Sequence, residues 1–287
     1  MEFTSNNLTF VIVTFNSRKV IDDCLNSLPK NFHKLIIENS SDKELKKELE
    51  QNYDKTKVVL SKNIGMGAGN NLGIAKSNTQ YVYVLNPDVV LQSDTLSKIN
   101  ISISNLENFA ILSPVSDNLG YPNYRTIKKK RESGYNGIEN VEEIDGYSMI
   151  INKEYFSDNI FFDENFFMYL ENVDLCLRAK KNNGRLFVIK NSKIHHLGSK
   201  AVDDRYSKEV EYSRNWHWMW SKFYFNKKHR GIFISFTLGI FSLLGNFFKY
   251  VIFFLILNKK KKIYRMRMSG IANALLGKQS WYRPEIN

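Results

Sequence analysis

The sequence predicts an α/β protein whose core is a doubly wound, mostly parallel sheet. Apolar runs of strand length alternate with helix-like segments over the first 115 residues. These runs are continuous rather than interleaved with polar residues, as expected for strands that helices cover on both faces. A chain of 287 residues, 43% of them hydrophobic, can form one large domain of this kind and an appendage.

The first five strands and the four helices between them are expected in alternating order. Ser17 is placed to cap the first helix, and Ser41–Glu44 has the spacing of a capping box at the start of the second. The strands are expected at 8–13, 35–37, 58–60, 81–85 and 110–115, and the helices at about 18–28, 42–52, 68–77 and 93–106.

The alternating pattern loosens after residue 116. Residues 116–143 are polar and basic and are expected to form a loop. Strands are expected at 144–151 and 185–189, and a helix over 168–182 that ends at Gly184.

The charge of the chain favours anionic partners. The net charge is +12 and the isoelectric point about 9.4, which suits a nucleoside diphosphate, a nucleic acid or an anionic lipid. Cys24 and Cys176 both fall inside expected helices, so we expect a reducing compartment and no disulfide. The N-terminus enters a strand almost at once without a basic segment, so no secretory signal is expected.

One apolar stretch indicates contact with a membrane. Residues 231–248 carry no charge, Lys249 interrupts the stretch, and it resumes to residue 257 between basic runs at 227–230 and 259–262. Positive charge on both flanks disfavours a single crossing. We therefore expect re-entrant or in-plane helices, broken near Gly245–Asn246; a buried pair of core helices is the alternative.

Asp88 is the first candidate for chemistry. It follows the apolar run 81–85 within Asn86-Pro87-Asp88. The carboxyl ends of strands in an open α/β sheet form the crevice where ligands bind. A carboxylate there can hold a divalent cation that neutralises a diphosphate, although an aspartate after proline is also a common turn residue.

A glycine- and asparagine-rich turn over 63–71 is the second candidate. Its glycines permit close approach of the backbone to a ligand, and the following helix start favours an anion. The glycines are spaced Gly65-x-Gly67-x-Gly69, and Asn70 stands where a dinucleotide-binding fingerprint needs glycine. The turn also follows the third strand rather than the first, so NAD or FAD binding is disfavoured.

Two further groups carry acid–base or ligand chemistry. Glu171 and Asp174 share one helix face, and either can serve as a general base; favourable helix-terminal charge and an ion pair with Arg178 are the plainer alternatives. His195 and His196 are neighbours on a strand and point to opposite faces, so one at most turns toward a metal shared with Asp88.

Taken together, these stretches resemble an inverting family 2 glycosyltransferase with a GT-A fold, of the bacterial rhamnosyltransferase-like branch. They occur in the family's order over about residues 1–205: FVIVTFNS (10–17), ENSS (38–41), NIGMGAGNNLGIA (63–75), LNPDVV (85–90), IDGYSMII (144–151), FDENFFMYLENVDLCLR (162–178) and KIHHLGS (193–199). The resemblance implies a catalytic domain over 1–205, with a Rossmann-like nucleotide-binding half. The apolar stretch and its basic flanks indicate a C-terminal apolar, helical, membrane-associating region over 206–287.

The resemblance also implies roles for single residues. Thr14, Asn16 and Glu38 match positions that hold the nucleobase and ribose, although Glu38 stands where the family commonly has Asp. Asp88 matches the metal-binding aspartate, and His196 the late histidine near metal and diphosphate, so Mg²⁺ or Mn²⁺ is the expected cofactor. The expected donor-binding residues are Thr14, Asn16, Glu38, Asn63, Gly67, Asn70, Asn86, Asp88, Asp145 and Gly146.

The family's Glu-Asp pair is Glu171-Asn172 here. An amide cannot act as a general base, so Glu171 is assigned that role, with Asp174 as the alternative. A third possibility is an impaired relative that only binds nucleotide sugar or glycan.

The expected reaction moves a sugar from a nucleoside-diphosphate sugar, of the dTDP-rhamnose or UDP-sugar type, to a glycan hydroxyl. The acceptor is expected to be lipid-linked and to serve polysaccharide synthesis for the bacterial cell envelope. We expect the protein on the cytoplasmic face of the inner membrane, bound peripherally or monotopically to anionic lipid. Nucleic acid is not an expected partner, because the basic runs flank the apolar stretch instead of interleaving with aromatic residues.

Overall fold

The structure, a computed structural model, describes residues 1–283 except 105, 107, 119, 121, 128–136, 157–159 and 199–201. Four consecutive basic residues within the loop expected at 116–143, residues 128–131, therefore lie outside the described residues. The chain divides into two compact units. Unit 1 comprises Met1–Asp163 and Asn172–Asp203, and unit 2 comprises Glu164–Glu171 and Asp204–Asn287.

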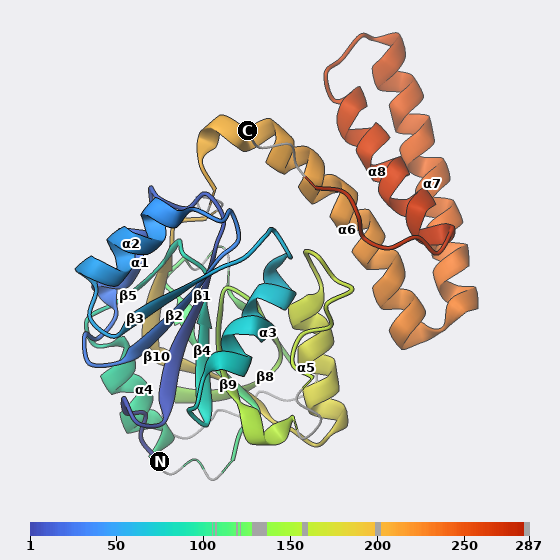
Figure 1. Ribbon diagram of the computed structural model, residues 1–287. Helices are drawn as coiled ribbons and strands as arrows, with labels where there is room; N and C mark the ends of the chain where they lie inside the picture. Colours follow the sequence, from blue (N-terminus) through green and yellow to red (C-terminus); the bar gives the residue numbers. More distant parts are fainter. Residues whose placement is uncertain are drawn as a thin grey trace. The chain divides into compact units, whose positions relative to one another are not determined.

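Unit 1 is built on a ten-stranded sheet whose first half is parallel, as predicted (Figure 1). Its order begins β3-β2-β1-β4, and β1 pairs in parallel with both β2 and β4. The strands β1, β2 and β4 are buried over most of their length, and β3, at the edge of the sheet, is only partly buried. The parallel pairing confirms the α/β fold class. The bounds are β1 (Leu8–Thr14), β2 (His33–Glu38), β3 (Thr56–Leu60) and β4 (Tyr81–Leu85).

The second half of the sheet is mixed. The strand β9 lies antiparallel between β4 and β6, and β10 runs parallel to β6 but antiparallel to β5 and β8. The strand β7 continues this edge beside β8. The bounds are β5 (Val89–Leu91), β6 (Ile111–Ser116), β7 (Tyr124–Thr126), β8 (Ile138–Ile144), β9 (Ser148–Asn152) and β10 (Leu186–His196).

Two strand predictions in this half were wrong. The strand expected at 144–151 is the last residue of β8 and most of β9, with a turn over 145–147 between them. The loop expected at 116–143 contains β7 and most of β8. The strand β8 escaped prediction because its sequence, IENVEEI, is only half buried near the sheet edge and lacks clean two-residue alternation.

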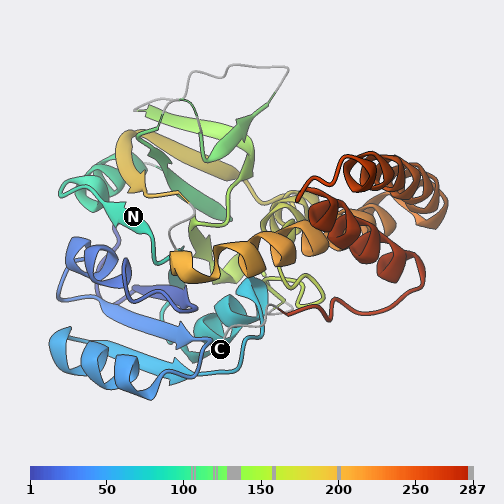
Figure 2. The same ribbon diagram turned by 90° about the horizontal axis from the view of Figure 1, so that it is seen from above.

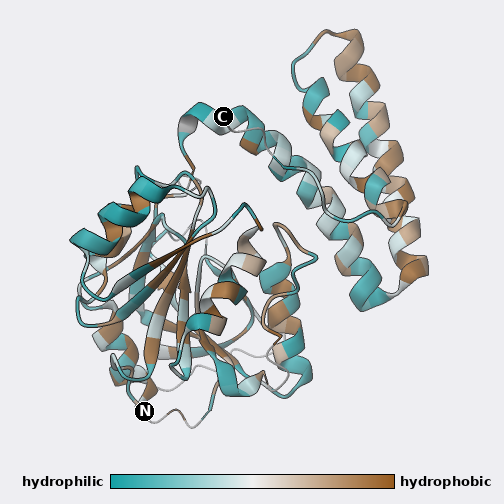
Figure 3. Cartoon of the chain, in the orientation of Figure 1, coloured by the Kyte–Doolittle hydropathy of each residue, from teal (hydrophilic) through white to brown (hydrophobic). Residues whose placement is uncertain are grey.

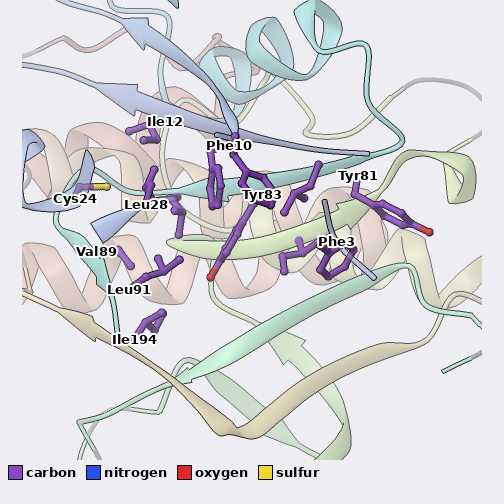
Figure 4. Close-up of a cluster of buried hydrophobic side chains, with 14 of the residues drawn as sticks. Phe3, Phe10, Ile12, Cys24, Leu28, Tyr81, Tyr83, Val89, Leu91 and Ile194 are labelled. Carbon is purple, nitrogen blue, oxygen red and sulfur yellow. The ribbon is translucent and has the colours of Figure 1, made fainter. Parts of the chain in front are cut away.

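Helices cover both faces of the sheet. α1 (Ile21–Ser27), α2 (Lys43–Asn52) and α4 (Thr95–Ile103) contribute to one apolar cluster, which also contains Phe10 and Tyr83 (Figure 4). The rings of Phe10 and Tyr83 lie 5.3 Å apart. α3 (Met66–Lys76) and α5 (Glu171–Lys181) contribute to the cluster on the other face, with Val11 and Val82. Alternate residues of β1 and β4 thus fill opposite layers, which fixes the strand register.

Unit 2 contains three helices with their own apolar core. They are α6 (Ser207–Arg230), α7 (Ile232–Leu255) and α8 (Lys261–Leu275), and α7 and α8 lie side by side in both views (Figures 1 and 2). The core consists of Trp216, Met219, Trp220, Phe223, Ile271 and Ala274. A Cβ at Gly270 would collide with the backbone carbonyl of Trp216, so this glycine permits the close approach of α8 to α6. Two short 3-10 turns also lie in the described part of the chain, Lys153–Tyr155 and Asp204–Tyr206.

The helix α7 corrects two expectations about the apolar stretch. It continues without a break through Gly245 and Asn246, because a glycine in a helix costs only about 1 kcal/mol and the Asn246 amide bonds back to the carbonyl of Ser242 at 2.7 Å. It is also not a core helix, since only 6% of its most apolar 18-residue window is buried. Figure 3 shows α7 coloured hydrophobic along most of its length. Among the described residues, α7 is the one helix long and apolar enough to cross a membrane.

Candidate functional site

The residues expected to hold the nucleobase and ribose lie at the ends of two neighbouring strands. Thr14 and Glu38 are register partners on β1 and β2, and both are fully buried. The Glu38 carboxylate accepts a hydrogen bond from the Ser40 amide at 2.9 Å and pairs with the Ser40 hydroxyl. Burial raises the pKa of Glu38, and the bonds from Ser40 oppose that rise. Asn16, just beyond β1, has a φ of 52°, a left-handed conformation that asparagine tolerates.

Asp88 and His196 come together as expected. Asp88 follows β4, its side chain is 1% exposed, and its Oδ1 lies 3.4 Å from Nε2 of His196. The antiparallel pairing of β5 with β10 fixes this geometry by placing Val89 opposite His196. His195 turns the other way, with Nδ1 3.0 Å from Asp117, so only one histidine of the pair faces Asp88.

The turn over 145–147 completes this group. The Tyr147 ring stacks on the His196 imidazole, with centroids 4.0 Å apart and planes 19° apart. The backbone N–H of Asn86 donates to the Tyr147 carbonyl at 3.0 Å, which ties the turn to the end of β4. Burial raises the pKa of Asp145, and electrostatic interactions with His196 and Arg125 oppose that rise. Asp145 thus belongs to the turn that joins the group around Asp88 through Tyr147.

Tyr147 was not among the expected site residues. The sequence assigned it to the middle of a strand, where it would only pack. The signal that could have found it is the Asp145-Gly146 dipeptide, which is typical of a turn.

The donor set around Asp88 suits a hard divalent cation only in part. Asp88 offers carboxylate oxygens and His196 an imidazole nitrogen, and a diphosphate and water are the usual further ligands of such an ion. Within the described part of the chain, no three His, Cys, Asp or Glu residues form a cluster able to hold a metal by themselves. The two side chains therefore fit a metal that is shared with a bound diphosphate.

The glycines of the glycine-rich turn also permit close packing of α3, a role that the sequence analysis did not assign to them. Gly65 caps α3 with a φ of 92°, and its carbonyl accepts the Asn39 amide at 3.2 Å. A Cβ at Gly69 would meet Val13 of β1 at 2.9 Å, and one at Gly73 would collide with Val11. These two glycines thus let α3 lie close on β1.

The expected donor-binding residues of this turn lie around the start of α3. Asn63 is half-buried before the helix, while Gly67 and Asn70 are buried inside it. The side-chain oxygen of Asn70 is buried without a hydrogen bond among the described residues.

Asp174 follows the plainer alternative. It is fully buried and accepts a hydrogen bond from Nε of Arg178 at 2.8 Å. The Arg178 guanidinium also donates to the carbonyl of Ile160 at 2.8 Å and to that of Phe161. The bonds to these carbonyls tie α5 to the preceding loop, and the ion pair with Arg178 disfavours Asp174 as the general base.

Asn172 has a definite partner. Its amide donates to the carbonyl of Ile144 at 3.0 Å, directly before the turn at 145–147. Its Cβ also lies 3.2 Å from the place where a Cβ on Gly146 would stand. The amide at this position therefore holds the turn that carries Asp145 and Tyr147.

Glu171 begins α5 and belongs to unit 2. Its Oε2 is buried and has no hydrogen-bond partner among the described residues. Burial raises the pKa of this carboxyl to about 7. A carboxylate with a pKa near neutrality is suited to accept a proton in a reaction at physiological pH.

Comparison with known proteins agrees with the fold. The family model described as "Glycosyl transferase family 2" matches residues 9–176. The chain is 26% identical over 195 residues to the low-salt glycan biosynthesis hexosyltransferase Agl10 of Haloferax volcanii, a match that covers 62% of this chain and 63% of that protein. It is 24% identical over 212 residues to the rhamnosyltransferase WbbL of Escherichia coli K12, covering 62% of this chain and 79% of that one.

Among solved structures, GalNAc-T7 with UDP, GalNAc and Mn²⁺ is similar in fold. The TM-score is 0.54 at 14% identity, and the match covers 66% of this chain and 43% of the other.

Proposed function

The chain belongs to glycosyl transferase family 2, and from this premise we propose that it is a metal-dependent, inverting sugar transferase. The proposed donor is a nucleoside-diphosphate sugar of the dTDP-rhamnose or UDP-sugar type, and the proposed acceptor is a glycan hydroxyl. The observation that carries the proposal is the buried Asp88 within 3.4 Å of His196 at the end of β4. A relative at 24% identity is a rhamnosyltransferase, which supports the choice of donor.

Asp88 and His196 are the residues that would hold Mg²⁺ or Mn²⁺. Such an ion neutralises negative charge as the diphosphate leaves. Tyr147 keeps the His196 ring in place by stacking, and the strand pairing of Val89 with His196 keeps both ligands at a fixed separation. The protein thus presents a pre-arranged pair of metal ligands and loses little conformational entropy when it binds the nucleotide sugar.

Glu171 is the proposed general base. Its carboxylate takes the proton of the acceptor hydroxyl while that oxygen forms a bond to the anomeric carbon. The bond from the anomeric carbon to the diphosphate breaks, and its electron pair leaves with the diphosphate. One displacement of this kind inverts the anomeric centre. The pKa of about 7 leaves Glu171 largely able to accept a proton above neutral pH.

An impaired relative that only binds its ligand is the second candidate, because Asn172 replaces a carboxylate. The hydrogen bond from Asn172 to Ile144 argues against impairment, since the amide has a structural task that a carboxylate cannot perform. Glu171, the adjacent residue, keeps a carboxylate available for proton transfer.

The deciding experiment uses the purified full chain and a panel of UDP- and dTDP-sugars with Mg²⁺ or Mn²⁺. Thermal stabilisation identifies the donor, and nucleotide release on addition of glycan acceptors measures transfer. Transfer that depends on the metal supports the proposal. Donor binding without hydrolysis or transfer under any condition would establish the binding-only alternative.

Unit 2 is proposed to attach the enzyme to the cytoplasmic surface of the inner membrane, where a lipid-linked glycan for cell-surface polysaccharide synthesis would be the acceptor. Apolar side chains project from α7 into solvent, among them Phe233 (87% exposed) and Phe241 (69% exposed). Basic runs at 227–230 and 259–262 flank the helix and complement anionic lipid.

The packing of α8 favours an orientation in the membrane plane. α8 lies along α7 and carries Lys261, Lys262, Arg265 and Arg267. If α7 crossed the bilayer, these charges would enter it, and each cation at the centre costs roughly 2.5–3.5 kcal/mol on insertion scales.

A further inference from the structure

The turn that leads into Glu171 is in an uncommon backbone conformation. Tyr169 and Leu170, the two residues before Glu171, have φ values of 71° and 68°. Neither is glycine, and two successive non-glycine residues rarely adopt this left-handed backbone conformation. Such a conformation persists only where the surrounding structure over-determines it. The source of that restraint lies within unit 2.

The helix α6 contacts each residue from Phe166 to Tyr169. The buried hydroxyl of Ser221 donates to the Met168 carbonyl at 2.8 Å. The rings of Phe166 and Tyr224 lie 4.9 Å apart, those of Phe167 and His217 4.5 Å, and those of Tyr169 and Trp218 5.6 Å. One face of α6 is thus fitted to the turn.

The C-terminal tail, residues 278–283, closes over the same place. The Arg283 guanidinium lies 3.6 Å from the centroid of the Phe167 ring, a cation–π contact on a buried aromatic side chain. Arg283 is about 115 residues beyond Phe167 in the sequence, so this contact is wholly tertiary.

His217 holds the tail against α6. Its Nε2 lies 2.7 Å from the Tyr282 carbonyl and therefore carries the hydrogen, which leaves Nδ1 to accept from the Ser280 hydroxyl at 2.8 Å. Burial lowers the pKa of His217 to about 3, so the ring stays neutral and both bonds persist at physiological pH. Trp220 adds a bond from Nε1 to the Lys278 carbonyl at 2.9 Å.

We propose that Ser221, His217 and Arg283 are positioning residues that hold the 166–170 turn and thereby aim and bury the carboxylate of Glu171. This inference rests on the proposed function of Glu171. It assigns unit 2 a part in the chemistry besides attachment to a membrane. Two cations contact aromatic rings of the turn: Arg283, and Lys228, whose ammonium lies 6.0 Å from the Phe166 ring centroid.

The test compares Arg283→Ala and Ser221→Ala with two controls in the full chain. Arg283→Lys keeps a cation for the Phe167 ring, and Gln279→Ala truncates an exposed side chain of the same tail. Arg283→Ala is expected to lower kcat by roughly tenfold or more and to change the donor KM by less than about twofold. The acidic limb of its kcat–pH profile should move to lower pH, because water reaching Glu171 returns its pKa toward the ordinary value. Arg283→Lys should retain most of the activity, and Gln279→Ala all of it.

Hydrogen exchange at residues 166–171 gives a second readout that does not depend on catalysis. Faster exchange there in Arg283→Ala and Ser221→Ala, but not in Gln279→Ala, is expected. Unchanged exchange, or a loss of kcat without a shift of the acidic limb, would overturn the inference. If Arg283→Ala does not fold, Ser221→Ala carries the same comparison. Wild-type kcat in Glu171→Gln would instead overturn the proposed function, so the two failures are distinguishable.

Discussion

The Oδ1 atom of Asp88 lies 3.4 Å from Nε2 of His196, although 108 residues separate the two in the chain. The relationship depends on the short strand β5, which starts directly after Asp88 and pairs with the end of β10. Leu197 adds a bond from its amide to the Asp88 carbonyl at 3.0 Å. Backbone hydrogen bonds on both sides of the pair thus set its geometry before any ligand binds.

Asp88→Asn is expected to reduce turnover by at least about 10²-fold. The substitution keeps the shape of the side chain but removes the charge that would hold the metal, a loss of a few kcal/mol in the transition state. Initial rates with and without excess EDTA measure the effect. Asp23→Asn, an exposed aspartate on α1, is the matched control. Full wild-type activity in excess EDTA contradicts metal dependence.

Glu171→Gln is expected to reduce kcat by roughly 10²–10⁴-fold with little change in donor affinity. In the wild type, kcat should fall about tenfold per pH unit below an apparent pKa of about 7, because the protonated carboxyl cannot accept the acceptor proton. A kcat–pH profile measures this limb. If kcat falls only slightly in Glu171→Gln but strongly in Asp174→Asn, Asp174 is the general base, despite its ion pair with Arg178.

Glu171→Gln should also stabilise the fold at high pH. The folded pKa of about 7 lies above the unfolded value near 4.5, so the folded state keeps the proton to higher pH. The contribution of Glu171 to the free energy of unfolding is therefore greatest below pH 4.5. It falls as the pH rises through 7, by at most about 3 kcal/mol. Urea denaturation at pH 5 and pH 8 should show the variant gaining on the wild type only at pH 8. An equal difference at both pH values would contradict the burial of this carboxyl.

The sequence predicted which candidate residues lie at strand ends, because the order of strands places those ends at one edge of the sheet. Thr14, Glu38 and Asp88 are of this kind. The turn over 145–147 was not predicted, because the apolar residues on both sides of it are typical of one continuous strand. The contact of Arg283 with Phe167 could not be predicted, since it depends on the packing of α6 and leaves no local pattern.

Asn172→Asp is expected to lower both stability and kcat. The carboxylate would face the Ile144 carbonyl, which loses the Asn172 amide as a donor, and the lost bond with the added repulsion should cost about 1–3 kcal/mol. Urea denaturation and kcat measure the two effects, and Asn172→Ala separates the lost bond from the added charge. A large rise in rate for Asn172→Asp would show that the natural chain is an impaired enzyme.

The double substitution Phe241→Asp with Leu244→Asp is expected to abolish binding to vesicles that contain anionic lipid. Both side chains are exposed on α7, and charge there opposes burial among acyl chains. Co-sedimentation measures binding, with Ile101→Asp, an exposed apolar position on α4 in unit 1, as the matched control. Wild-type binding should weaken as salt rises, because each basic residue near the surface contributes about 1 kcal/mol of screened attraction.

Protease access in sealed vesicles separates surface attachment from a true crossing. If α7 lies in the membrane plane, a protease that reaches the catalytic residues of unit 1 also reaches residue 287. Lys249, whose ammonium lies 5.8 Å from the Tyr264 ring of α8, remains near the lipid headgroups in this orientation. Cleavage of residue 287 only from the opposite side would establish α7 as a membrane-spanning helix, since its 24 residues, at about 1.5 Å each, reach across a bilayer core.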